Sequence, residues 1–208
     1  MTSDVRFETL WRRLSLRGDA SVWHARLLEC YAEPQRAYHT LQHLEECLSL
    51  LSRNLHLAVE PAEVEISLWF HDAIYNVTAR DNEARSAEWA EEELSRVGVN
   101  AERIERVKRH ILATRHAVLP QGQDQKLLVD VDLSILGAAR ARFEEYEAQV
   151  REEYSWVPEP HFRQRRAEVL AEFLERQPIY NTSALRESHE SQARENLAYS
   201  LQKLRGGG

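Results

Sequence analysis

Apolar residues recur three or four positions apart along almost the whole chain, the spacing that places them on one face of an α-helix. No segment alternates apolar and polar residues in the way that a half-buried strand does. The pattern therefore predicts an all-α fold, a single helical bundle of about eight to ten helices. Representative apolar stripes are Phe7, Leu10, Trp11 and Leu14; Trp23, Leu27, Leu28 and Tyr31; Leu44, Cys47, Leu48 and Leu51; and Phe143, Tyr146, Val150 and Tyr154.

Several helix ends can be predicted from residues that favour them. Pro61 stands where a helix can begin, because proline suits the first helical position. The helix that begins there is expected to end near Asn76. Asp81 or Asn82 is expected to cap the next helix, since short polar side chains bind free N–H groups at helix starts. Gly137 is expected to end a later one.

The chain of 208 residues is most simply read as one domain over residues 1–205, followed by a flexible glycine tail at 206–208. Two small domains are the less favoured alternative. A chain of this length can bury a sizeable core without a disulfide. The two cysteines, Cys30 and Cys47, form no disulfide framework, which favours a reducing, cytoplasmic compartment.

Charge and hydropathy narrow the class of partner. The formal net charge is -7, which disfavours long nucleic acids because their binding relies on many Lys and Arg contacts to phosphate. A small phosphorylated ligand held by a few arginines is still compatible with this charge. No apolar run approaches the roughly 20 residues of a membrane span. We therefore expect no membrane partner.

His71 and Asp72 stand side by side inside the apolar segment EISLWFHDAIYN, residues 65–76. A carboxylate near the end of a helix is disfavoured by the helix dipole, and its burial is costly unless it is paired. A positive group is therefore expected against Asp72. An arginine, a hydrogen-bonding tyrosine or a metal ion would each meet this need.

Other segments favour the metal ion. His39 and His43 are four residues apart and share one helical face, a workable chelating arrangement. Asp130 and Asp132 repeat the pattern of acids inside an apolar helical run. One divalent ion would explain these groups together. Imidazole and carboxylate ligands without thiolate favour Mn, Fe, Co, Ni or Zn.

The order of these motifs resembles the HD-domain superfamily of metal-dependent phosphohydrolases. The match extends from about residue 36 to 200, and the HD core would cover about 36–140. It resembles most a group of about 200 residues described as predicted metal-dependent HD-superfamily phosphohydrolases. The segments that carry the resemblance are YHTLQHLEECL, LWFHDAIYN, DNEARSAEWA, ATRH, DVDLSILG and IYNTSALRE with ARENL.

The resemblance implies a set of metal ligands. His71 and Asp72 match the HD pair, and Asp132 matches the distal aspartate, with Asp130 as the neighbouring alternative. His43 matches the first histidine. Two further histidines have less direct roles: His39 would be a partner near the ligands or facing phosphate, and His116 stands where some two-metal members have an extra ligand. One or two ions are thus implied.

The resemblance also implies a reaction, the hydrolysis of a small phosphorylated metabolite or nucleotide by a metal-activated water. Asp72 would hydrogen-bond this water and Glu83 would assist it. Arg36 and other basic residues lie near the motifs, but each is individually more typical of a surface charge. Tyr75 stands near the position where many relatives have a lysine. The candidate substrate-binding residues are Arg85, Arg115, His39 and Tyr75.

Two alternatives remain open at the level of sequence. Some HD-fold proteins hold two irons and oxidise their substrates with O₂, and His39, His110 and His116 would supply the additional ligands. The other alternative is a non-catalytic protein that binds a metal or nucleotide and signals to a partner. The sequence also allows a homodimer.

Overall fold

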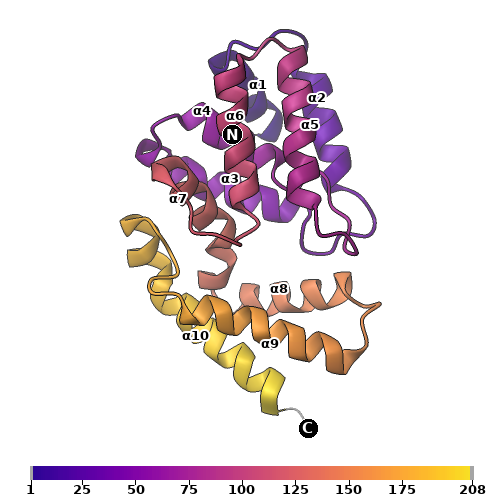
Figure 1. Ribbon diagram of the computed structural model, residues 1–208, viewed down its shortest axis with the longest axis vertical. Helices are drawn as coiled ribbons and strands as arrows, with labels where there is room; N and C mark the ends of the chain where they lie inside the picture. Colours follow the sequence, from indigo (N-terminus) through magenta and orange to yellow (C-terminus); the bar gives the residue numbers. More distant parts are fainter. Residues whose placement is uncertain (1, 207–208) are drawn as a thin grey trace. The chain divides into compact units, whose positions relative to one another are not determined.

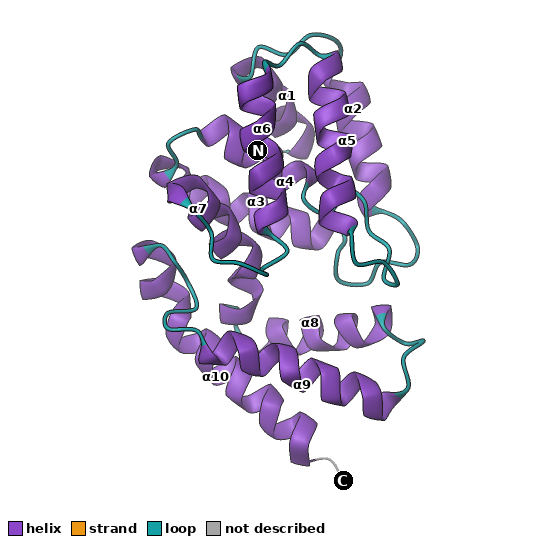
Figure 2. Ribbon diagram, viewed as in Figure 1, coloured by secondary structure: helices purple, strands orange, loops and turns teal. Residues whose placement is uncertain are grey.

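The computed structural model describes residues 2–206, which form ten α-helices, two short 3-10 helices and no strand (Figures 1 and 2). The predicted all-α fold is therefore confirmed. None of these helices combines the length and apolar character that crossing a membrane requires. The elements are α1 (Ser3–Arg13), α2 (Ala20–Tyr31), α3 (Leu41–Asn54), η1 (Leu55–Leu57), α4 (Pro61–Phe70), α5 (Asn82–Arg96), α6 (Ala101–Ala113), α7 (Gly122–Asp132), η2 (Leu133–Gly137), α8 (Arg140–Glu153), α9 (Glu159–Glu175) and α10 (Ser183–Gly206).

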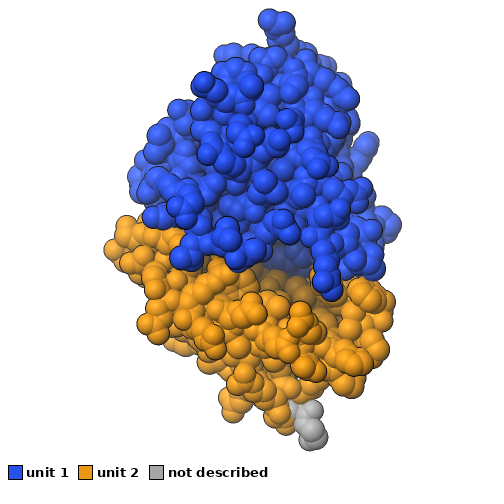
Figure 3. All heavy atoms as spheres, in the orientation of Figure 1, with its two compact units in different colours: residues 1–129 blue, residues 130–208 orange. Residues whose placement is uncertain are grey.

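The chain divides into two compact units, residues 1–129 and 130–208, coloured separately in Figure 3. The first unit contains α1 to α6 and most of α7. The second begins with the last turn of α7 and continues through α10. The single domain over residues 1–205 stays a prediction. Of the predicted tail, Gly206 is the last residue of α10, and 207–208 lie outside the described residues.

Helix α4 is the centre of the first unit. It is apolar around most of its circumference, as expected for a helix with neighbours on all sides. It packs against α1, α3, α5 and α6. Trp69 has no exposed surface and meets the ring of Phe7 edge-on at 5.0 Å. Pro61 is its first residue, as predicted, and α4 carries the chain directly into the HD pair.

The predicted end of this helix near Asn76 was wrong, because α4 ends at Phe70. Beyond this residue, side chains of other segments bind the backbone groups that a longer helix would pair internally. The Arg36 guanidinium donates hydrogen bonds to the carbonyl oxygens of Asp72 and Ala73 in the following turn. The N–H of Ile74 donates to the Ser86 hydroxyl at 3.0 Å. These contacts turn the chain away from the helix axis immediately after the HD pair.

In the second unit, a buried aspartate fixes the segment that leads into α10. Asp130 has no exposed surface, and its carboxylate accepts hydrogen bonds from the backbone and side chains of Asn181 and Thr182, at 2.6 to 2.8 Å. Nearby, the Tyr180 hydroxyl donates to the carbonyl of Leu133 at 3.0 Å. Asp130 is thus accounted for by a structural role.

Candidate metal centre

His43, His71 and Asp72 come together from two packed elements of the first unit. His43 lies in the first turn of α3, and His71 immediately follows the last residue of α4. The helices α3 and α4 pack against each other. Both histidines are buried, with 2% and 1% of their surface exposed, and the Asp72 side chain is 14% exposed. The apolar helices thus hold these polar groups in the core.

The potential ligand atoms of the three residues converge on one point. The Nε2 atoms of His43 and His71 are 3.2 Å apart. Oδ2 of Asp72 lies 2.9 Å from Nε2 of His71 and 3.5 Å from Nε2 of His43. Two imidazoles and one carboxylate are a ligand set suited to a divalent transition metal. The cluster could therefore hold such an ion.

The orientation of the His71 ring shows that this point needs positive charge. Its Nδ1 lies 2.7 Å from the carbonyl oxygen of Leu68, which can only accept a hydrogen bond, so Nδ1 carries the proton. In the neutral ring, Nε2 then has a lone pair that faces the Asp72 carboxylate. Two acceptors 2.9 Å apart repel unless a cation lies with them. A second proton on His71 or a metal ion meets this requirement.

The ionisation of Asp72 agrees with this arrangement. Burial by itself raises the pKa of its carboxyl, because a buried charge loses hydration. The charge of His71, and the hydrogen bonds from His43 and His71, outweigh burial and hold the pKa of Asp72 well below its usual range. Asp72 is therefore a carboxylate at neutral pH, the form that binds a cation.

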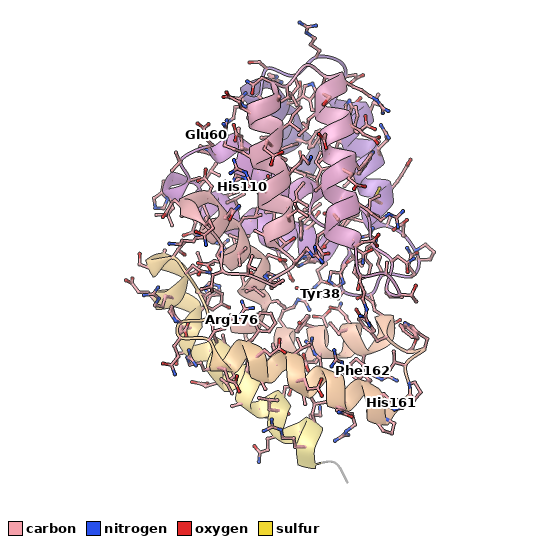
Figure 4. The ribbon with its side chains drawn as sticks, viewed as in Figure 1. Tyr38, Glu60, His110, His161, Phe162 and Arg176 are labelled. Atoms are coloured by element: carbon pink, nitrogen blue, oxygen red, sulfur yellow. The ribbon has the colours of Figure 1, made fainter. Side chains whose placement is uncertain are left out.

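Aromatic rings lie beside the cluster. The His39 ring stacks on Tyr75 with 4.1 Å between centroids and 27° between planes. Tyr38, labelled in Figure 4, packs against His39 at 4.9 Å and against His43 at 4.7 Å. The structure thus places two predicted substrate-binding residues, His39 and Tyr75, in contact with each other and next to the cluster.

The other predicted site residues are spread over several elements. Asp132 is the last residue of α7, within the second unit, and His116 lies in a turn after α6 with a φ of 55°. Their roles as metal ligands stay predictions. Glu83 is half-buried in the first turn of α5, while Arg85 and Arg115 are exposed. The catalytic role of Glu83 and the substrate-binding roles of the two arginines also stay predictions.

Sequence reasoning missed two buried residues that contact the backbone of the HD pair. Arg36 was interpreted as a surface charge, but its side chain has no exposed surface. The Tyr31 hydroxyl donates to the carbonyl of Trp69 at 3.1 Å and accepts the N–H of Asp72 at 3.4 Å. Burial raises the pKa of Tyr31 to about 12, so it stays a protonated donor. In the sequence, Tyr31 looks like one more apolar stripe position.

Comparison of the chain with protein-family models, with curated proteins and with solved structures finds no match in any of the three. The function is therefore argued from the geometry of the cluster and from the order of the motifs.

Proposed function

We propose that this chain is a metal-dependent phosphohydrolase of the HD-domain type, acting on a small phosphorylated metabolite or nucleotide. The observation that best supports the proposal is the convergence of His43, His71 and Asp72 within 2.9 to 3.5 Å of one another. The contact with the Leu68 carbonyl holds the His71 ring so that, in its neutral form, the Nε2 lone pair faces a carboxylate. A site of this kind is suited to a divalent cation.

We propose that His43, His71, Asp72 and Asp132 hold one ion of Mn, Co, Ni, Fe or Zn, and that His116 contributes to a second. A bound ion of this kind lowers the pKa of water and polarises a phosphoryl oxygen. The donor chemistry is consistent with this role, because neutral imidazoles and carboxylates both bind these metals.

The chain's own residues would orient and deprotonate the reactants. The Asp72 carboxylate accepts a hydrogen bond from the attacking water, and Glu83 receives its proton. Arg85 and Arg115 donate to the non-bridging oxygens of the phosphate. These charge-assisted bonds are the usual means of binding phosphate in proteins. His39 and Tyr75, which stack beside the cluster, contact the rest of the substrate.

Charge and cysteine content support the substrate class and the compartment. A net charge of -7 opposes binding to long nucleic acids and is compatible with a small phosphorylated substrate. Cys30 and Cys47 are both free thiols, as expected of a cytoplasmic protein.

The test is to purify the protein with Mn²⁺, Co²⁺ or Ni²⁺ and to assay a panel of nucleotides and phosphate esters. We expect turnover by the wild type, and none by the His71→Ala/Asp72→Ala double variant. His56→Ala, which changes an exposed histidine, is the matched control. Activity that survives in the double variant would rule out the proposal. Bound iron with O₂ consumption, or nucleotide binding without turnover, would instead support the oxygenase or signalling alternative.

A further inference from the structure

Arg36 is a fully buried cation beside the candidate metal centre. Its side chain has no exposed surface, and the guanidinium carbon lies 5.3 Å from the ring centroids of both Tyr31 and Tyr75. Burying a charge is unfavourable unless hydrogen bonds and counter-charges compensate for the lost water. The contacts of Arg36 therefore indicate its role.

All five N–H donors of the Arg36 guanidinium are used within the first unit. Nε and Nη2 donate to Oε2 of Glu33 at 3.0 and 2.8 Å. Nη1 donates to the carbonyls of His39 at 3.1 Å and Asp72 at 2.6 Å. Nη2 donates its second proton to the carbonyl of Ala73 at 3.1 Å. Since a guanidinium has five donors, none is left for a phosphate oxygen.

The three backbone acceptors belong to the two segments that carry the site. One is the carbonyl of His39, just before α3 and its ligand His43. The other two are the carbonyls of Asp72 and Ala73, in the turn after α4. Arg36 thus joins the backbones of the segments that present both imidazoles and the carboxylate.

We infer that Arg36 is a positioning residue, which fixes the turn after α4 and the start of α3 so that His43, His71 and Asp72 converge. This inference rests on the proposed function for its consequence in catalysis. Its structural basis is independent of that function. The planar fork of arginine is essential here, because lysine has three donors and cannot span the same set of acceptors.

The experiment compares Arg36→Lys with Arg53→Lys. Arg53 lies in α3, is exposed, and donates to the Ser49 hydroxyl. Co²⁺ affinity is measured by calorimetry and turnover of 4-nitrophenyl phosphate by steady-state kinetics. Amide hydrogen exchange at Asp72, Ala73 and Ile74 is measured in the metal-free protein. Amide exchange reports on the stability of the turn itself, whereas Co²⁺ affinity and turnover report on the metal site.

For Arg36→Lys we expect at least tenfold weaker Co²⁺ binding, a lower kcat with little change in KM, and at least tenfold faster exchange at the three amides. Arg53→Lys should leave all of these unchanged. If Arg36→Lys does not fold, Glu33→Gln is used in its place. This variant removes the negative charge that pairs with Arg36 but keeps the guanidinium, and it should also make exchange at the three amides faster.

The two proposals fail in different ways. A folded Arg36→Lys protein with unchanged exchange at the three amides would overturn the positioning role, whatever the metal does. The same holds if Glu33→Gln, used in its place, leaves exchange unchanged. Faster exchange in a protein whose wild type binds no Co²⁺ would support the positioning role and overturn the proposed function.

Discussion

His71 donates its Nδ1 proton to the carbonyl oxygen of Leu68, 2.7 Å away, in the turn that ends α4. One contact that orients the His71 ring is therefore made with the last turn of α4, the helix that His71 directly follows. Histidines that bind metals commonly use their second ring nitrogen in this way, which fixes the tautomer and raises the basicity of the ligating nitrogen. The orientation of the histidine of the HD pair thus depends in part on a contact with a residue only three positions away.

A ligand that binds only the folded state should stabilise it. We expect saturating Co²⁺, at about 100 times its dissociation constant, to raise the free energy of unfolding by about 2.7 kcal/mol, and a chelator to reverse this. Thermal unfolding of wild type and His71→Ala, with Co²⁺ and with chelator, measures the effect. The variant should not respond to Co²⁺. An equal response in both proteins would place the ion elsewhere.

The neighbouring acids of α7 should separate into a structural and a ligating residue. Asp130→Asn weakens the bonds to Asn181 and Thr182 and leaves buried donors poorly paired, so it should lower the free energy of unfolding by about 2 kcal/mol. Metal content should stay unchanged. Asp132→Asn should do the reverse, lowering metal affinity with a smaller change in stability. Urea unfolding and elemental analysis of both variants test this, and an exchange of the two phenotypes would contradict it.

Loss of the Tyr31 hydroxyl should lower the free energy of unfolding. Tyr31→Phe removes the acceptor of the Asp72 N–H and the donor to the Trp69 carbonyl. We expect a loss of about 1 to 3 kcal/mol in unfolding free energy, because buried polar groups lose their partners. Tyr199→Phe, at an exposed tyrosine of α10, should have little effect. Urea unfolding of both variants gives the comparison, and equal losses would show that the Tyr31 hydroxyl has no special role.

Stability at mildly acidic pH should depend on His110 (Figure 4), which is 6% exposed. Burial lowers its pKa, although Asp124 and Glu63 oppose this. Folding therefore favours the neutral form of His110. The contribution of His110 to the free energy of unfolding is fully present above the pKa of about 6.5 that a histidine has in the unfolded chain. As the pH falls below that value, the unfolded chain binds a proton that the folded chain resists, so stability is lost.

Between pH 7.5 and 5.5, the wild type should lose about 1 kcal/mol more unfolding free energy than His110→Gln. Urea unfolding at the two pH values measures the difference. His56→Gln, at an exposed histidine, is the control and should behave like the wild type. If His110→Gln shows the full acid dependence of the wild type, the titrating group lies elsewhere.

The part of the structure that could be predicted from sequence is the part set by local patterns. Helical spacing and a favourable first residue were enough to predict that a helix starts at Pro61. The prediction that His39 and His43 share one helical face was wrong, because α3 begins at Leu41 and His39 lies in the turn before it, although the two rings are still only 6.0 Å apart. The meeting of His43 with His71 and Asp72 was expected from the resemblance of the motif order to the HD-domain superfamily and not from local spacing.

The errors concern contacts between distant segments. Nothing in the residues after Phe70 signals the end of α4, because the groups that end it, Arg36 and Ser86, belong to other parts of the chain. Asp130 and Asp132 look alike in the sequence. Only the contacts of Asp130 with Asn181 and its neighbour give it a structural role. Partner identity at long range is not encoded in periodicity.

The end of α4 also has a consequence for the order of folding. The turn that carries Asp72 is held by Tyr31 and Arg36, which precede it by 41 and 36 residues. Such contacts form only after the intervening loop has closed, and that closure is opposed by chain entropy. The backbone hydrogen bonds within α4, by contrast, join residues close in sequence and require no such loop closure. The turn that carries Asp72 should acquire its final shape late, when α2 and the segment after it have docked, so a nascent chain would form α4 before His71 and Asp72 reach their final positions.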